Sequence, residues 1–110
     1  MGAVRGTTPD YILTLADYDL SGKTVYVTIA QRGKRMTFTG DRLRIASGES
    51  GSTIAFSLTQ AETLSLKVGD AEVQLKCIDR SGEVDASGTG ELTISRALLE
   101  EVIKYADDTD

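Results

Sequence analysis

The chain contains no histidine and no tryptophan. Histidine is the commonest general base, the usual activator of serine and cysteine nucleophiles and the commonest metal ligand, so its absence excludes the most frequent catalytic and metal sites. A zinc site would also need several cysteines, and tryptophan is the usual aromatic platform for sugars. No two acidic residues stand together in a context that suits paired-carboxylate catalysis. We therefore predict that the protein is not an enzyme, and we expect no catalytic, cofactor-binding or metal-binding residues.

Cysteine is also scarce, because Cys77 is the single one in the chain. One cysteine cannot close an intrachain disulfide, which excludes a disulfide-dependent secreted scaffold. Cys77 shares its strand parity with Val73 and Leu75, so we predict that it is buried and unreactive. No stretch approaches the about 18 apolar residues of a membrane span, and the first residues lack the apolar centre of a signal peptide. We expect folding in a reducing cytoplasm and no membrane contact.

Charge and length set two further bounds. The 17 acidic and 12 basic residues give a net charge of -5, which argues for solubility and against binding to nucleic acid. A chain of 110 residues forms one domain and is large enough to bury a core without disulfides or metals. We therefore expect a single domain over residues 1–110.

The stretch Thr53–Cys77 organises the rest of the chain. It begins with apolar alternation, continues through Thr59 and Glu62 at capping-box spacing, and resumes alternation after Gly69. We predict that Thr59 and Glu62 form a structural cap on one helical turn. This turn then carries the chain from one sheet of a sandwich to the other. The inward residues of the two strands are Ile54, Phe56, Leu58, Val73, Leu75 and Cys77.

Alternation of apolar and polar residues also predicts strands before this stretch. We expect strands over Tyr11–Leu15 and Thr24–Ala30, followed by a hairpin turn at Gln31–Lys34. In the next strand Met36 and Phe38 face inward. The alternation indicates that each of these strands is half-buried, with one face in the core and one in solvent.

The remaining strands follow the same pattern. Leu43 and Ile45 are predicted to point inward, and Ser47–Ser52 to form an exposed loop. A hairpin at Asp79–Gly82 leads into one long strand, Val84–Ile94, with a bulge at its glycines. About seven short strands indicate an all-β fold, an immunoglobulin-like antiparallel β-sandwich without its disulfide, with a partly open barrel as the alternative.

The two ends of the chain have their own patterns. Residues 1–9 are small and polar and are expected to form an N-terminal arm, and residues 107–110 an acidic tail. Between Ser95 and the tail, apolar residues recur at helical spacing and predict a C-terminal helix over residues 97–106. So short a helix is stable only if its apolar side chains are buried, either against its own sandwich or against a partner. The apolar stripe consists of Leu98, Leu99, Val102 and Ile103.

Five basic residues cluster on the hairpin between positions 32 and 44. They are interpreted as a solvated face that protects a sheet edge, with a protein contact as the functional alternative, since the interleaved aromatics of a nucleic-acid surface are missing. Together with the helix stripe, they define a candidate interaction surface made of Tyr26, Arg35, Arg42, Arg44, Leu99 and Ile103.

The residues from Asp17 onward match the first half of a calcium-binding loop but not its closing position. Asp17, Asp19 and Gly22 occupy the first, third and sixth positions of such a loop. The closing position, which requires a bidentate glutamate, is Thr28. We interpret the segment as a connecting loop whose aspartates bond to their own backbone.

Four short segments carry a further signal: Arg5–Pro9, Leu58–Thr63, Val73–Leu75 and Ala86–Ser87. Together they resemble a family of short proteins encoded by phages and prophages of Gram-positive gut bacteria, and the resemblance spans nearly the whole chain. The chain departs from the family at Ala61, where members carry a second acid. The resemblance implies a structural or tail-associated particle protein without enzymatic activity or cofactor, and Thr59 and Glu62 transfer only as a cap.

Two function hypotheses follow. The first is a non-enzymatic structural module of a phage or prophage virion, at the tail or baseplate. Its partners would be other phage structural proteins or itself as a homo-oligomer. The second is a carbohydrate- or cell-surface-binding β-sandwich module, whose recognition groove would be lined by Tyr11, Tyr18 or Tyr26.

Overall fold

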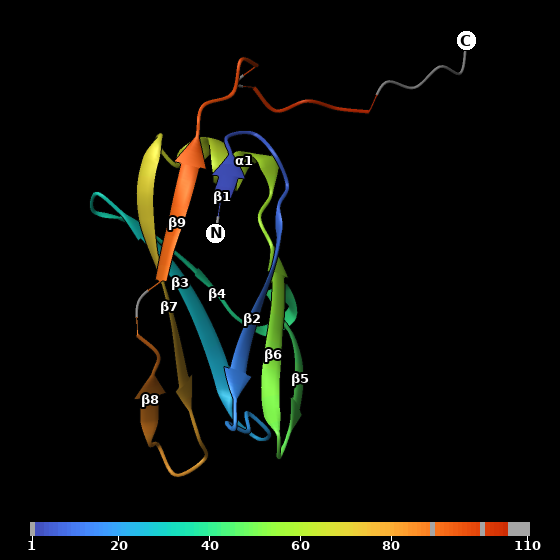
Figure 1. The fold of residues 1–110 in the computed structure, drawn as a ribbon, viewed down its shortest axis with the longest axis vertical. Coiled ribbons are helices and arrows are strands. Elements are labelled where there is room, and N and C mark those ends of the chain that lie inside the picture. Colours follow the sequence, from blue (N-terminus) through green and yellow to red (C-terminus); the bar gives the residue numbers. More distant parts are fainter. Residues whose placement is uncertain (1, 89, 100, 106–110) are drawn as a thin grey trace.

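The computed structural model describes residues 2–88, 90–99 and 101–105 and shows an all-β protein (Figure 1). Two sheets face each other across the apolar core. The three-stranded sheet has the order β2 (Asp10–Ala16), β6 (Gly51–Ser57), β5 (Arg44–Gly48). The six-stranded sheet has the order β1 (Gly2–Val4), β9 (Gly90–Ser95), β7 (Gly69–Ile78), β3 (Thr24–Gln31), β4 (Lys34–Phe38), with β8 (Val84–Ala86) paired to β7.

The core forms because successive strand residues point to opposite faces. In β3, Val25, Val27 and Ile29 are buried, and they lie opposite Cys77, Leu75 and Val73 of β7. The other sheet contributes Ile54 and Phe56 from β6. These strands and their inward residues confirm the predicted alternation, and Cys77 is buried at 3% exposure. Its low reactivity toward thiol reagents stays a prediction.

Two short helical segments connect the sheets. The 3-10 turn η1 (Gly40–Arg42) links β4 to β5, and the helix α1 (Gln60–Ser65) links β6 to β7. The predicted crossing from one sheet to the other through a capped turn is therefore confirmed. Figure 1 shows α1 closing one end of the sandwich, where β1 and the end of β9 also lie.

Two of the three predictions for the chain ends, the N-terminal arm and the C-terminal helix, are wrong. The N-terminal arm contains β1, which pairs in parallel with β9 through Ala3 and Ile94, and Ala3 is buried. The predicted helix over 97–106 is absent from its described residues, which run in irregular conformation. Residues 100 and 106 of the predicted helix and the acidic tail, residues 107–110, lie outside the described residues.

Three local predictions also need correction. The predicted strand Val84–Ile94 is split into β8 and β9, because Ser87 donates its N–H to the Leu75 carbonyl at 2.8 Å and accepts the Leu75 N–H on its own hydroxyl at 3.0 Å. Ile45 lies opposite Ile54 but is 41% exposed, since β5 is an edge strand. The Ser47–Ser52 loop is instead a tight turn between β5 and β6, and Ser52 is buried.

Candidate functional site

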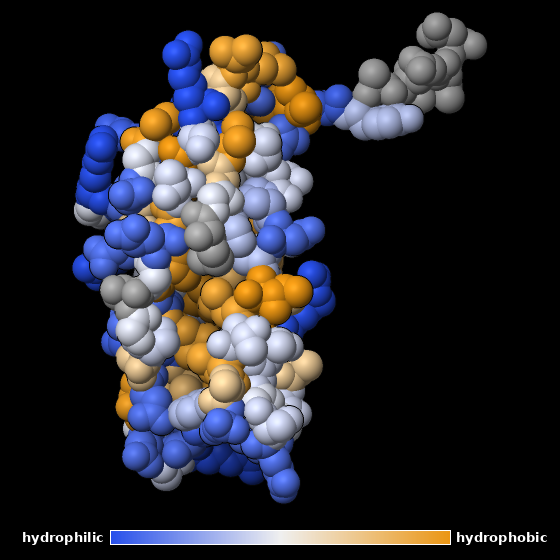
Figure 2. All heavy atoms as spheres, in the orientation of Figure 1, coloured by the Kyte–Doolittle hydropathy of each residue, from blue (hydrophilic) through white to orange (hydrophobic). Residues whose placement is uncertain are grey.

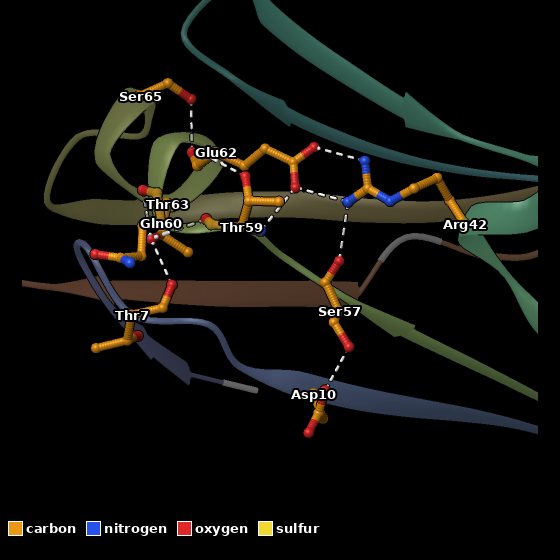
Figure 3. A network of polar contacts seen from close by, with 9 residues as sticks. All are labelled: Thr7, Asp10, Arg42, Ser57, Thr59, Gln60, Glu62, Thr63 and Ser65. Atoms are coloured by element: carbon orange, nitrogen blue, oxygen red, sulfur yellow. Dashed lines mark hydrogen bonds and ion pairs between the residues drawn. The ribbon is translucent and has the colours of Figure 1, made fainter. Parts of the chain in front are cut away.

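The start of α1 is held by the predicted cap (Figure 3). The Thr59 hydroxyl accepts the Glu62 N–H at 3.1 Å, and the Glu62 carboxylate accepts the Thr59 N–H at 2.8 Å. Two backbone donors that a helix start leaves unpaired are thereby satisfied. The capping box predicted from the spacing of these two residues is confirmed.

Arg42 belongs to this cap rather than to a basic patch. Its guanidinium donates to both Glu62 carboxylate oxygens at 2.7 and 3.0 Å and to the Ser57 carbonyl at 3.0 Å, and it lies over the Phe38 ring at 4.7 Å. Burial raises the pKa of Glu62, but the hydrogen bonds from Arg42 and Thr59 outweigh it, so that the pKa is lowered on balance. The stabilisation from this pair is therefore present above the usual carboxyl pKa of 4.5 and is lost as the pH falls through the lowered value.

The N-terminal segment is tied to the other side of α1. The hydroxyl of the fully buried Thr63 donates to the Thr7 carbonyl at 2.8 Å and accepts the Gly6 N–H at 3.0 Å. The Arg5 guanidinium donates to the carbonyls of Leu64 and Leu66 at 2.7 and 2.8 Å, which satisfies acceptors at the helix end. These contacts join residues more than 50 positions apart, so no local pattern in the sequence predicts them.

Residues 97–99 and 101–105 run past this end in irregular conformation and extend beyond the sandwich (Figure 1). The Gln60 side-chain amide fixes their backbone by donating to the Ile103 carbonyl at 2.9 Å and accepting the Ile103 N–H at 2.8 Å. The apolar side chains stay uncovered, and Figure 2 shows apolar residues gathered at this end of the molecule. Their exposed fractions are 95% for Leu98, 57% for Leu99, 55% for Val102, 53% for Ile103 and 95% for Tyr105. We call these five residues the apolar segment.

The predicted interaction surface is only partly brought together. Leu99 and Ile103 lie in the apolar segment, and Val102 of that segment lines the same shallow hollow as Arg42 at the α1 end. Tyr26 and Arg35 lie on the outer face of the six-stranded sheet, and Arg44 shares the outer face of the three-stranded sheet with Ile12. The predicted basic face of the hairpin is therefore wrong, because its members separate onto different sheets. The remaining members of that cluster are Arg32 and Lys34.

The three tyrosines considered for carbohydrate recognition also separate. Tyr11 is buried beside Phe56, and Tyr26 is 39% exposed on the outer face. Tyr18 alone lines a groove of about 300 Å³ between β2 and β8. Its hydroxyl donates to Asp85 at 2.6 Å, and this hydrogen bond is the main cause that raises the pKa of Tyr18 to about 12.

The calcium-like loop is a turn. The Asp19 carboxylate accepts the Ser21 N–H at 2.9 Å, and hydrogen bonds from Ser21 lower the pKa of Asp19. Within the described part of the chain, no group of three or more potential ligands is placed to hold a metal ion. No helix among those residues is long and apolar enough to cross a membrane.

Comparison with known proteins gives no family. No family model matches the chain, and no curated protein matches it. Among the similar solved structures is a mutant of the SrpA adhesin from Streptococcus sanguinis, with a TM-score of 0.47 and 13% sequence identity. The similarity covers 86% of this chain and 54% of that chain, so this chain spans about half the length of the adhesin structure. A similarity of this size does not establish a common family or function.

The capping box at Thr59 is expected to contribute to the stability of the fold. Replacing Thr59 with alanine should lower the free energy of unfolding by about 1 kcal/mol, because it frees a backbone donor at the start of α1. The control Arg44→Ala, at an exposed position of β5, should stay within about 0.5 kcal/mol. Urea unfolding followed by circular dichroism measures both. Equal losses for the two variants would contradict the importance of the cap.

Proposed function

We propose that this chain is a non-enzymatic structural module of a phage or prophage particle, at the tail or baseplate, that acts through protein–protein contacts. One observation carries the proposal: five large apolar side chains of the segment 97–105 are at least half exposed at the α1 end. Exposed apolar groups gathered at one place are typical of protein-binding surfaces. The family resemblance of the sequence supports the particle as the setting.

Hydrogen bonds at the α1 end fix the backbone that carries the apolar segment. The Gln60 side chain fixes the backbone at Ile103, and the Thr59, Glu62 and Arg42 network fixes the helix that carries Gln60. Apolar anchors on a rigid support bind a partner with less loss of conformational entropy than anchors on a free tail. The exposed charged residues Glu101 and Lys104 lie among these apolar residues and give the surface a polar rim.

The strand order supports an immunoglobulin-like version of the β-sandwich. If β2, β6 and β5 are taken as strands B, E and D, then β3, β7 and β9 correspond to C, F and G. In that fold strand A lies beside B. Here the first strand, β1, lies beside β9 instead.

The test places the variant Leu99→Glu, Ile103→Glu in the phage or prophage that encodes the chain. We expect the wild-type chain in purified particles at a fixed ratio to the other structural proteins, and the variant at less than about one tenth of it, since a buried interface does not accept unpaired carboxylates. The control Val84→Glu changes a residue of similar exposure, 55%, on β8. It should enter particles normally.

Two results would contradict the proposal. One is the absence of the wild-type chain from particles, and the other is normal incorporation of the double variant. The purified variants should unfold at the same urea concentration as the wild type, because the substituted side chains are already half exposed. This check separates a lost contact from a lost fold.

A carbohydrate- or cell-surface-binding module is the second candidate. The groove beside Tyr18 favours it, because an aromatic ring and the Asp85 carboxylate meet at its edge. Binding on a glycan array that the variant Tyr18→Ala abolishes would support this candidate. An array without any binding would count against it.

A further inference from the structure

We infer that β2 is a pairing edge at which two copies of this chain join their three-stranded sheets into one continuous sheet. Such self-association is separate from the contacts proposed at the α1 end. In the three-stranded sheet β2 pairs with β6 on one side and, among the described residues, with no strand on the other.

The unpaired side of β2 presents backbone groups in a known order. Backbone hydrogen bonds join Leu58 to Pro9 at 3.1 Å and Asp17 to Ser50 at 3.2 Å, so the odd-numbered residues of β2 bond to β6. Antiparallel pairs alternate, and the even-numbered residues therefore direct N–H and C=O away from β6. These outward residues are Asp10, Ile12, Thr14 and Ala16.

The β2 edge is poorly protected against strand pairing along most of its length. Natural edges are protected by charges, prolines, bulges or short length. The edge strand β4 begins with two charges, Lys34–Arg35, and β5 is only five residues long. By contrast, β2 is seven residues long, its one charge is Asp10 at the start, and it carries no charge and no proline from Tyr11 to Ala16.

Side chains along the same edge are incompletely covered. Leu13 and Leu15 point toward the core but are only partly buried, and Leu15 lines the open groove between β2 and β8. Figure 2 shows apolar atoms along the middle of this side of the molecule. Ile12 on the opposite face of β2 is 69% exposed. A strand added beside β2 would cover both faces at once.

A second copy fits this edge in an antiparallel register centred on Leu13. The register places Ile12 opposite Thr14 of the second copy and Asp10 opposite Ala16, so all outward residues pair and about eight hydrogen bonds form. It also sets Leu13 against Leu13 of the second copy, and no like charges face each other. Such a two-fold contact is the commonest form of self-association.

The experiment measures the mass of the purified full chain by sedimentation equilibrium. We expect a dimer for the wild type and at least about tenfold weaker association for Thr14→Pro, which removes an outward N–H that β6 does not use. The control Thr14→Val keeps the N–H and should leave the dimer unchanged. A wild-type monomer at high micromolar concentration, or a dimer unaffected by Thr14→Pro, would overturn the inference.

A disulfide test decides the register and does not depend on the proline variant being folded. In the double variant Ile12→Cys, Thr14→Cys, each new cysteine faces the other in the second copy at about 5.5 Å between Cα atoms, which suits a disulfide. We expect a covalent dimer on mild oxidation, with the buried Cys77 left out. The control Asp10→Cys, Thr14→Cys is offset by two residues and should stay monomeric under denaturing conditions. Equal cross-linking of both variants, or none in the first, would overturn the inference.

Discussion

Replacing Phe56 with alanine should lower the free energy of unfolding by about 3–5 kcal/mol. Phe56 is 1% exposed, and its ring centre lies 5.4 Å from that of Tyr11 and 5.9 Å from that of Phe38. Tyr11 lies in the three-stranded sheet with Phe56, whereas Phe38 belongs to the six-stranded sheet. The substitution therefore removes the aromatic contact that joins the two sheets and leaves a cavity between them.

The matched control is Tyr26→Ala, which removes an aromatic ring from the exposed face of β3. It should cost less than about 1 kcal/mol, because Tyr26 is 39% exposed and lies outside the core. Far-UV circular dichroism in urea measures both variants, since the chain has no tryptophan for fluorescence. Similar losses at the two positions would contradict the assignment of Phe56 to the centre of the core.

Replacing Gly51 with alanine should cost about 2 kcal/mol or more. Gly51 begins β6 with a φ of +143°, a backbone conformation that residues with a side chain rarely adopt. A Cβ there would also lie 2.7 Å from the Leu15 carbonyl oxygen, and 3.4 Å from backbone atoms of Ala16 and Asp17. The neighbours are backbone atoms, so they cannot rotate away and the strands must shift.

Gly48 supplies the control within the same turn. It pairs with Gly51, but a Cβ on it would meet no atom within 4 Å. Gly48→Ala should be neutral or stabilise by up to about 1 kcal/mol, because alanine restricts the unfolded chain. Urea midpoints for the two variants give the comparison. A Gly51→Ala protein as stable as the Gly48→Ala protein would contradict the described turn.

The strands and the cap could be predicted because their determinants are local. Alternating residues such as Val25, Val27 and Ile29 identify the inner face of a strand, and the spacing of Thr59 and Glu62 identifies a helix start. These patterns hold within a few positions of sequence. They led to the correct inner residues for β3, β6 and β7.

The helical spacing of residues 97–106 predicts a helix that their described part does not form, and the reason is physical. An α-helix over residues 97–106 would have paired the Ile103 N–H with the Leu99 carbonyl. In the structure the Gln60 side chain takes both the N–H and the carbonyl of Ile103. A helix of about ten residues has little stability of its own, so this competing contact from 43 positions away decides the conformation.

Only part of the candidate site could be predicted from the sequence, because its other contacts join residues far apart in the chain. Leu99 and Ile103 were found by their apolar character, which is a local property. The pairing of Arg42 with Glu62 spans 20 positions, and the bonds from Thr63 to the N-terminal segment span 56 and 57. Closeness in sequence predicts one basic face, but Arg42 ends the η1 turn and Arg44 begins β5 in the three-stranded sheet.

Cross-linking mass spectrometry of purified particles tests the central claim most directly. An amine-reactive cross-linker can report on Lys104 in the segment 97–105, on Lys67 just after α1, and on Lys76 on the outer face of the six-stranded sheet. We predict cross-links from this chain to other particle proteins at Lys104 and Lys67. Particles that lack the chain, or cross-links to other proteins at Lys76 alone, would contradict the claim that the α1 end is the contact surface.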